Sequence, residues 1–95
     1  MDARERIAQR KQRRVWAKLH AKRQGGRCLY CRTPFVHGHP DLFPTFDHKV
    51  PTTRGGAETF ENGCACCHLC NSHKGDMTAA EFIDSRTRGA AEWRT

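Results

Sequence analysis

The pattern of hydrophobic and polar residues predicts one long helix in the first quarter of the chain. Residues 3–23 contain no Gly or Pro and many strong helix formers. Hydrophobic side chains recur there at steps of about one or two helical turns, which indicates a thin apolar stripe. The stripe consists of Ile7, Val15, Trp16 and Leu19. The pair Gly25-Gly26 ends the pattern, so we expect a helix that packs one side on the protein and turns its arginines outward.

The next part of the chain predicts loops and two short strands. Residues 26–46 carry Gly and Pro and are expected to be irregular. Residues 45–50 form a plausible strand that Pro51 stops, and the Arg-Gly-Gly sequence at 54–56 must lie in a loop. Residues 63–66 are small and fit a second strand.

The last third of the chain predicts two helices. The first opens between positions 68 and 74 and ends at Gly75. Thr78 and Glu81 have the spacing of a capping box, which places the start of a second helix near Ala79. We expect this helix to run to about residue 88 and to end at Gly89.

The composition indicates one small domain with a weak hydrophobic core. The chain has 95 residues, of which 37% are hydrophobic, and a good share of these are Cys or Ala. Such a core needs a metal ion, disulfides or oligomerisation to stabilise it. No apolar run has membrane-spanning length, and no apolar segment of a secretory signal follows the basic start. We therefore expect a cytoplasmic protein whose six cysteines are reduced and bind metal.

The positive charge is concentrated at the start of the chain. Residues 1–24 hold nine Lys and Arg residues against two acidic residues, which accounts for the net charge of +7. Residues 1–25 are therefore expected to form an arm for a polyanion, with a DNA or RNA backbone as the obvious partner. A solvated helix face, an acidic protein and a membrane surface are the alternatives. The side chains expected to contact nucleic acid are Arg6, Arg10, Arg13, Arg14, Lys18 and, from the glycine loop, Arg54.

Two Cys-x-x-Cys pairs, with 35 residues between them, predict a structural zinc site. The pairs are Cys28 with Cys31 and Cys67 with Cys70. Each pair can direct two sulfurs at one tetrahedral ion, and four thiolates suit zinc or iron. Cys64 offers a rival pairing with Cys67, or a mixed site with His68. In a strand, however, Cys64 and Cys66 would share one face as small buried side chains. Free or redox-active thiols are the alternative to a metal site.

Several polar residues between and after the cysteine pairs could hydrolyse a phosphodiester. That reaction needs an activated water and a charge that offsets the developing oxyanion. His48 suits the base, because imidazole titrates near neutrality. Asp47 points away from His48 in a strand, so it could hold a hard cation from the other side, with Asn71 as a second ligand. Lys74 follows Asn71 on the same helix face and could contact phosphate.

The ordered set of motifs closely resembles the HNH endonuclease family. The chain carries in order Cys-x-x-Cys, Asp47-His48 followed by Val50-Pro51, the Arg54-Gly55-Gly56 loop, Asn62, and a second Cys-x-x-Cys followed by Asn71 and Lys74-Gly75. Each piece is weak alone, but their conjunction over residues 27–83 is specific. The position of Asn71 is often His in the family. His73 is a poor substitute, because two helical residues place it about 200° from Asn71.

The resemblance implies an α+β fold, a zinc-stabilised ββα-metal domain over residues 26–89 with a short C-terminal helix and a tail at 90–95. It implies that His48 is the general base and that Asn62 orients the loop and His48. Asp47 and Asn71 would bind the catalytic divalent cation, Mg²⁺ or another such as Mn²⁺. The four paired cysteines would bind structural Zn²⁺.

The expected activity is that of a metal-dependent endonuclease that nicks or cuts double-stranded DNA. In the family, small members are often of phage or mobile-element origin, and a protein partner could supply the specificity that so short a chain lacks. The alternative is a zinc-containing nucleic-acid-binding module without catalysis. Only the nuclease explains why Asp47, His48, Asn62, Asn71 and Lys74 occur together.

Overall fold

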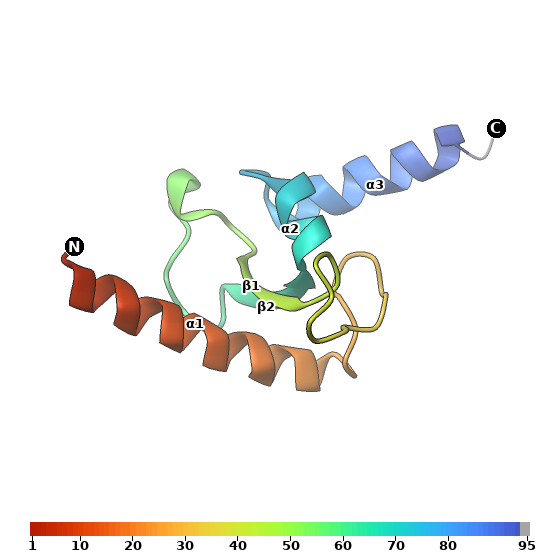
Figure 1. Cartoon of the computed structure of the whole chain (residues 1–95). Helices are drawn as coiled ribbons and strands as arrows, with labels where there is room; N and C mark the ends of the chain where they lie inside the picture. Colours follow the sequence, from red (N-terminus) through yellow and green to blue (C-terminus); the bar gives the residue numbers. More distant parts are fainter. Residues whose placement is uncertain (94–95) are drawn as a thin grey trace.

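A two-stranded antiparallel sheet flanked by helices organises the chain. The computed structural model describes residues 1–93, with side chains described to residue 87. The elements are α1 (Ala3–Arg23), β1 (Pro44–His48), the short 3-10 helix η1 (Thr52–Arg54), β2 (Gly63–Cys67), α2 (His68–Lys74) and α3 (Ala79–Trp93). In the sheet, Asp47 of β1 lies opposite Cys64 of β2. The α+β class is confirmed, and β1, β2 and α2 form its ββα centre (Figure 1).

The sheet separates α1 from α2 (Figure 1). Successive side chains of a strand point to opposite faces, so alternate residues of β1 contact different helices. Phe46 meets Trp16 of α1, with ring centroids 5.3 Å apart. Thr45 accepts a hydrogen bond from the side-chain amide of Asn71 in α2 at 3.0 Å. β1 ends at His48, two residues earlier than the sequence predicts, whereas α2 covers the predicted residues.

The buried face of α1 differs from the apolar stripe that the sequence predicts. The fully buried residues of the helix are Ala17 and His20, and Trp16 beside them is half-buried. The other three residues of the predicted stripe are about half exposed. They are Ile7, Val15 and Leu19, at 52%, 51% and 49%. The extent of the helix was predictable, but the prediction of its packing face was wrong except at Trp16.

Polar contacts explain this difference. The ring of His20 stacks on Phe60 with 3.9 Å between centroids, and its Nε2 bonds to the Phe60 carbonyl at 2.8 Å. The side chain of Gln24 donates to the carbonyl of Ala65 at 2.8 Å and accepts from the Ala65 amide at 3.0 Å. These bonds satisfy backbone groups of β2 that the sheet leaves unpaired. A search for hydrophobic periodicity does not count such side chains as part of a packing face.

Gly63 allows Phe46 to lie flat against the sheet. A Cβ atom at position 63 would come within 2.0 Å of the Phe46 ring, a distance at which atoms overlap. Only glycine fits at this position, because it has no side chain to displace the ring. The contact fixes the aromatic layer between the sheet and α1.

The hydrophobic core consists largely of cysteines, as its weak composition suggests. The buried cluster contains Cys28, Cys66, Cys67, Cys70 and Phe82, so Phe82 is its one large apolar side chain among the residues described. Cys64 and Cys66 are buried at 2% and 0% exposure, which confirms their expected burial. A core of this kind stabilises little by apolar burial alone.

α3 begins where predicted and extends further than predicted. The amide of Glu81 donates to the Thr78 hydroxyl at 3.1 Å, and the amide of Thr78 donates to the Glu81 carboxylate at 2.9 Å. This is the expected capping box. The helix passes through Gly89 to Trp93 and projects from the body of the protein (Figure 1). Glycine costs only about 1 kcal/mol in a helix, and two alanines follow it. No helix in the described part of the chain is long and apolar enough to span a membrane.

Candidate active site and metal centre

A cavity of about 240 Å³ opens where β1, the loop after it and the end of α2 meet. Of the residues predicted to carry chemistry, Asp47, His48, Asn71 and Lys74 line this cavity. The others in its wall are Phe46, Pro51, Thr52, Thr53, Gly75 and Asp76. The chain therefore brings residues 46–53 and 71–76 together at one site.

Asp47 is held at the base of this cavity by two donors. Its side chain is almost fully buried, and its Oδ2 accepts a hydrogen bond of 2.6 Å from the Tyr30 hydroxyl. Its Oδ1 lies 3.2 Å from the ammonium nitrogen of Lys74. Burial raises the pKa of the Tyr30 phenol, and the nearby charges raise it further, so this hydroxyl stays a donor. A buried carboxylate needs such partners, because an unpaired charge in the interior is costly.

Lys74 does not occupy the position that a phosphate contact requires. Its side chain is 1% exposed, and its ammonium group donates to the carbonyl of His48 at 2.9 Å as well as facing Asp47. The phosphate contact predicted for Lys74 does not match this geometry. The lysine instead joins α2 to the end of β1 and offsets the charge of the buried aspartate.

Asn71 presents an amide with one end already fixed. Its nitrogen donates to the Thr45 hydroxyl at 3.0 Å, which assigns the orientation of the amide and leaves the carbonyl oxygen available for a ligand. Carboxylate and amide oxygens are the donors that Mg²⁺ prefers, and this ion keeps several waters of its own. Asp47 and Asn71 line one cavity and offer such oxygens, so the residues present fit a divalent cation there.

His48 has a partner that the sequence does not reveal. Its Nε2 lies 2.7 Å from Oε2 of Glu58, in the loop between the strands. The same carboxylate forms two hydrogen bonds of 2.8 Å with Arg13 of α1. The bonds from Arg13, and then those from His48, lower the pKa of Glu58 to about 2, and in return Glu58 raises the pKa of Arg13. Arg13 is thus engaged inside the protein, although the sequence suggests a nucleic-acid contact.

Asn62 closes the loop that carries Glu58. Its side chain donates to the carbonyls of Val50 and Ala57, both at 2.9 Å, and accepts from the Val50 amide at 3.1 Å. Asn62 therefore joins both ends of the loop directly after the strand that presents His48. Its contacts are with the backbone around His48 rather than with the imidazole.

The four cysteines of the two Cys-x-x-Cys pairs form one cluster. The sulfur atoms of Cys28, Cys31, Cys67 and Cys70 all lie within 4.8 Å of one another, and all are free thiols. Such a set could hold a tetrahedral zinc ion. A hydrogen bond with Cys70 lowers the pKa of the Cys28 thiol to about 4, so the cluster readily holds a thiolate.

Cys64 and Cys66 lie outside this cluster. The Cys64 sulfur is 3.6 Å from both the Tyr30 hydroxyl and the Asp47 carboxylate, and the Cys66 sulfur is 3.5 Å from the Thr45 hydroxyl. Burial raises the pKa of the Cys64 thiol to about 12, which keeps it protonated. These two thiols support the wall under the active-site cavity.

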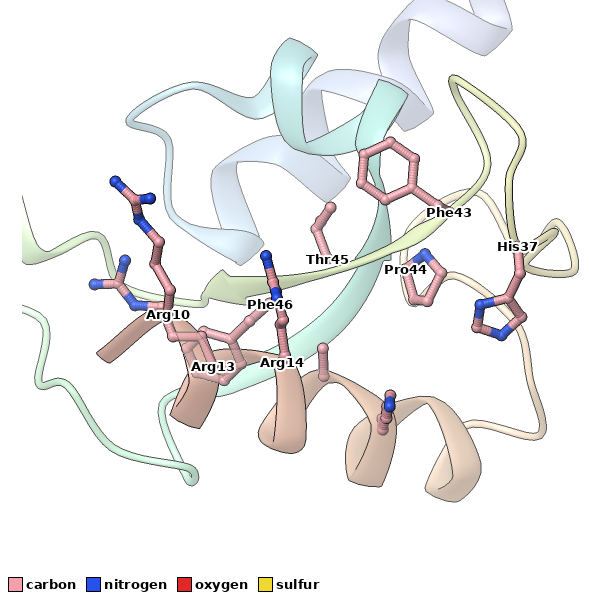
Figure 2. A pocket seen from close by; sticks show the side chains of 10 residues that line it. Arg10, Arg13, Arg14, His37, Phe43, Pro44, Thr45 and Phe46 are labelled. Atoms are coloured by element: carbon pink, nitrogen blue, oxygen red, sulfur yellow. The ribbon is translucent and has the colours of Figure 1, made fainter. Parts of the chain in front are cut away.

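A second, larger cavity of about 430 Å³ lies between α1 and β1. Figure 2 shows arginine side chains of α1 on one side of it and the residues of β1 and its approach on the other. Its lining comprises Arg10, Arg13, Arg14, Ala17, Lys18, His37, Phe43, Pro44, Thr45 and Phe46. The floor is therefore apolar and the rim cationic. Four of the six residues predicted to contact nucleic acid meet here.

The other predicted nucleic-acid contacts lie elsewhere. Arg54 of η1 pairs with Glu81 of α3, and both side chains are nearly half exposed. Arg6 is exposed in the first half of α1. His73 is exposed and lines neither cavity, in line with a solvated side chain, whereas His68 stacks on Phe43 at 5.0 Å.

Comparison with known proteins identifies the class. The sequence model of the HNH endonuclease family matches residues 28–87, and the chain belongs to this family. A relative is the CRISPR-associated endonuclease Cas9 of Corynebacterium diphtheriae, 35% identical over 67 residues. The match covers 70% of this chain and only 6% of that protein. No solved structure matches the chain. Membership supports nuclease activity in general and a nucleic acid as substrate.

Proposed function

We propose that this protein is a metal-dependent endonuclease that hydrolyses phosphodiester bonds of double-stranded DNA. The observation that carries the proposal is the single cavity lined by Asp47, His48 and Asn71. An unrelated binding domain has no reason to place a histidine, a buried carboxylate and an anchored amide around one space. These are the groups that a phosphodiester hydrolysis needs.

In this proposal His48 is the general base. Its neutral imidazole accepts a proton from a water that attacks phosphorus. The bond from phosphorus to the 3′ oxygen breaks, and that oxygen takes a proton from solvent water, which gives 5′-phosphate and 3′-hydroxyl ends. Asp47 and Asn71 would hold a divalent cation, Mg²⁺ or Mn²⁺, whose chemistry is to offset the negative charge on the reacting phosphate. Lys74 faces the Asp47 carboxylate and holds it in place, and Asn62 fixes the loop beside His48.

We assign a structural role to the cysteine cluster. Four thiolates satisfy the coordination of zinc, which leaves no open position for a substrate. Cys28 and Cys31 precede β1, whereas Cys67 and Cys70 lie at the start of α2. An ion bound there would join the loop before β1 to the junction of β2 and α2, and so would stabilise the ββα unit that carries Asp47 and Asn71.

The larger cavity is the proposed path of one DNA strand. It shares Phe46 with the active-site cavity, so the two lie next to each other along β1. Thr45 and His48 are three residues apart, which is about 10 Å in a strand. Arg14 and Lys18 line the same cavity as Thr45, so they would meet backbone phosphates near the cleaved bond. No ion pair joins Arg10, Arg14 or Lys18 to an acidic side chain within the described residues.

A plasmid-nicking assay with Mg²⁺ or Mn²⁺ tests the proposal. The wild type should nick, and His48→Ala should abolish nicking while zinc content stays unchanged and the protein still unfolds cooperatively. His73→Ala is the matched control, since this histidine is exposed on α2 and lines neither cavity. Equal activity of His48→Ala and the wild type would reject His48 as the base. A wild type that binds DNA without cutting it would identify a non-catalytic binding module.

A further inference from the structure

We propose that Glu58 is a positioning residue for His48, and that Arg13 of α1 holds Glu58 in place. This inference rests on the proposed function, because it concerns the residue assigned as the base. The geometry that carries it is a continuous chain of hydrogen bonds from α1 through the loop to β1. The residues of this chain, Arg13, Glu58 and His48, are named the clamp below.

The clamp has the geometry of strong, charge-assisted bonds. Nε and Nη2 of Arg13 meet the two oxygens of Glu58 at 2.8 Å each, a bidentate arrangement. Oε2 also lies 2.7 Å from Nε2 of His48. The side chains of Arg13, Glu58 and His48 are 36%, 29% and 16% exposed, so water competes least at the histidine. Arg13 thereby fixes a carboxylate that would otherwise rotate freely in the loop.

The carboxylate determines which nitrogen of His48 carries the proton. An ionised carboxylate only accepts hydrogen bonds, so Nε2 must be the donor. In a neutral imidazole Nδ1 is then the nitrogen with a free lone pair, and only that nitrogen can accept a proton from water. Phe46 packs edge to face with the ring, at 5.1 Å between centroids. The contact with Phe46 and the bond to Glu58 together fix the orientation and the tautomer of His48.

The groups around the clamp do not offer a competing partner for Nε2. Asp47 points to the other face of β1, where Tyr30 and Lys74 occupy its oxygens. The hydrogen bonds of Asn62 go to the backbone of the loop. Glu58 is therefore the acceptor that faces His48 in the described structure.

The tautomer can be measured without any activity. Nitrogen-15 chemical shifts of the His48 ring, recorded on the zinc-loaded full chain at neutral pH, should show the Nε2-protonated form as the main species. Glu58→Ala should give a mixture of tautomers. Glu61→Ala is the control, because Glu61 is an exposed glutamate of the same loop. A wild type with the Nδ1-protonated form, or a Glu58→Ala protein with unchanged shifts, would overturn the proposal.

Nicking kinetics give a second readout. Glu58→Ala should lower kcat by about 10- to 100-fold and leave KM nearly unchanged. This is the effect of removing a partner that orients a histidine at a metal site. Glu58→Gln keeps an acceptor oxygen for Nε2 and should restore part of kcat. The double variant Arg13→Ala with Glu58→Ala should lose no more than Glu58→Ala alone, since Arg13 acts through Glu58. If the double variant instead lost kcat by the product of the two single losses, and Arg13→Ala reduced the salt slope of DNA binding by about one, Arg13 would contact phosphate.

These two experiments separate the clamp from the proposed function. If the wild type does not nick DNA, the proposed function fails, and the nitrogen shifts alone decide whether Glu58 sets the tautomer. If the wild type nicks and Glu58→Ala nicks equally well, the function stands and the clamp is rejected. A melting midpoint for each variant accompanies both experiments, and Glu58→Gln serves where Glu58→Ala does not fold.

Discussion

Loss of one cysteine of the cluster should unfold the protein, whereas loss of a neighbouring cysteine should not. Cys67 belongs to the four-thiol cluster, and Cys64 is three residues away on the same strand and equally buried. Cys67→Ser removes one of the four thiols that could hold zinc. Cys64→Ser removes a sulfur whose hydrogen-bond partners among the described residues are Tyr30 and Asp47. The two variants change the same atom type at two positions of one strand.

The structure indicates how large the difference should be. Phe82 is the one large apolar side chain of the buried core among the described residues, and full burial of a phenylalanine contributes about 1.5–3 kcal/mol. Zinc binding to four thiolates contributes about 10–16 kcal/mol to folding, several times the contribution of that side chain. A serine at position 64 can still donate to the Asp47 carboxylate, so its cost should be near 1 kcal/mol.

Zinc content and thermal unfolding measured on the same preparations test this reasoning. Wild type and Cys64→Ser should each hold one zinc ion and show a cooperative transition. Cys67→Ser, and the wild type after treatment with a strong chelator, should lose both. If Cys64→Ser lost its zinc while Cys67→Ser kept it, the assignment of ligands would be wrong. A chelated wild type that stays folded would show that the core does not depend on the ion.

Three further outcomes follow from the charged groups. The pKa of Glu58 is lower in the folded protein than in the unfolded chain, so the ionised carboxylate stabilises the fold at pH values above the unfolded pKa. Glu58→Gln should therefore lower the free energy of unfolding by on the order of 2 kcal/mol at pH 7. In urea titrations, the difference in unfolding free energy between the wild type and Glu58→Gln should stay constant down to about pH 5 and become smaller below it. Lys74→Met leaves the charge of the buried Asp47 carboxylate without its cationic partner, and should lower the free energy of unfolding by about 3–5 kcal/mol in the same assay. Adding Asp47→Asn removes that charge and should recover part of the lost stability. DNA binding can be measured without cleavage in the His48→Ala protein. There, Arg10→Gln combined with Arg14→Gln should reduce the salt slope of binding by about two. The control pair, Arg4→Gln with Lys11→Gln, should leave the slope nearly unchanged, because these residues do not line the cavity.

Local sequence patterns predicted most of the elements. The absence of Gly and Pro predicted the extent of α1, and the Thr78 and Glu81 pair predicted the start of α3. The order of the motifs predicted that Asp47, His48 and Asn71 lie at one site, and the structure places them around one cavity. These signals depend on residues close in the sequence, or on an arrangement that the whole family shares.

The contacts that sequence analysis missed join distant parts of the chain through polar side chains. Glu58 lies ten residues from His48 and 45 from Arg13, and no spacing rule connects the three. His20 of α1 bonds to the Phe60 carbonyl, 40 residues away, and no sequence pattern predicts this contact. Charge counting treated every arginine of α1 alike, and could not separate Arg13, which binds Glu58, from Arg10 and Arg14, which line the same cavity without an ion pair in the described residues.

The two roles of α1 follow from its helical geometry. Adjacent residues of a helix point about 100° apart, so a run of basic residues cannot face a single partner. All three arginines line the larger cavity, but the guanidinium of Arg13 is held by Glu58, whereas Arg10 and Arg14 form no ion pair within the described residues. In the proposed function one helix therefore both binds the DNA strand and orients the base. Loss of Arg14 should weaken binding at unchanged kcat, and loss of Arg13 should lower kcat at unchanged binding. An effect of both variants on binding alone would mean that α1 serves only to hold the substrate.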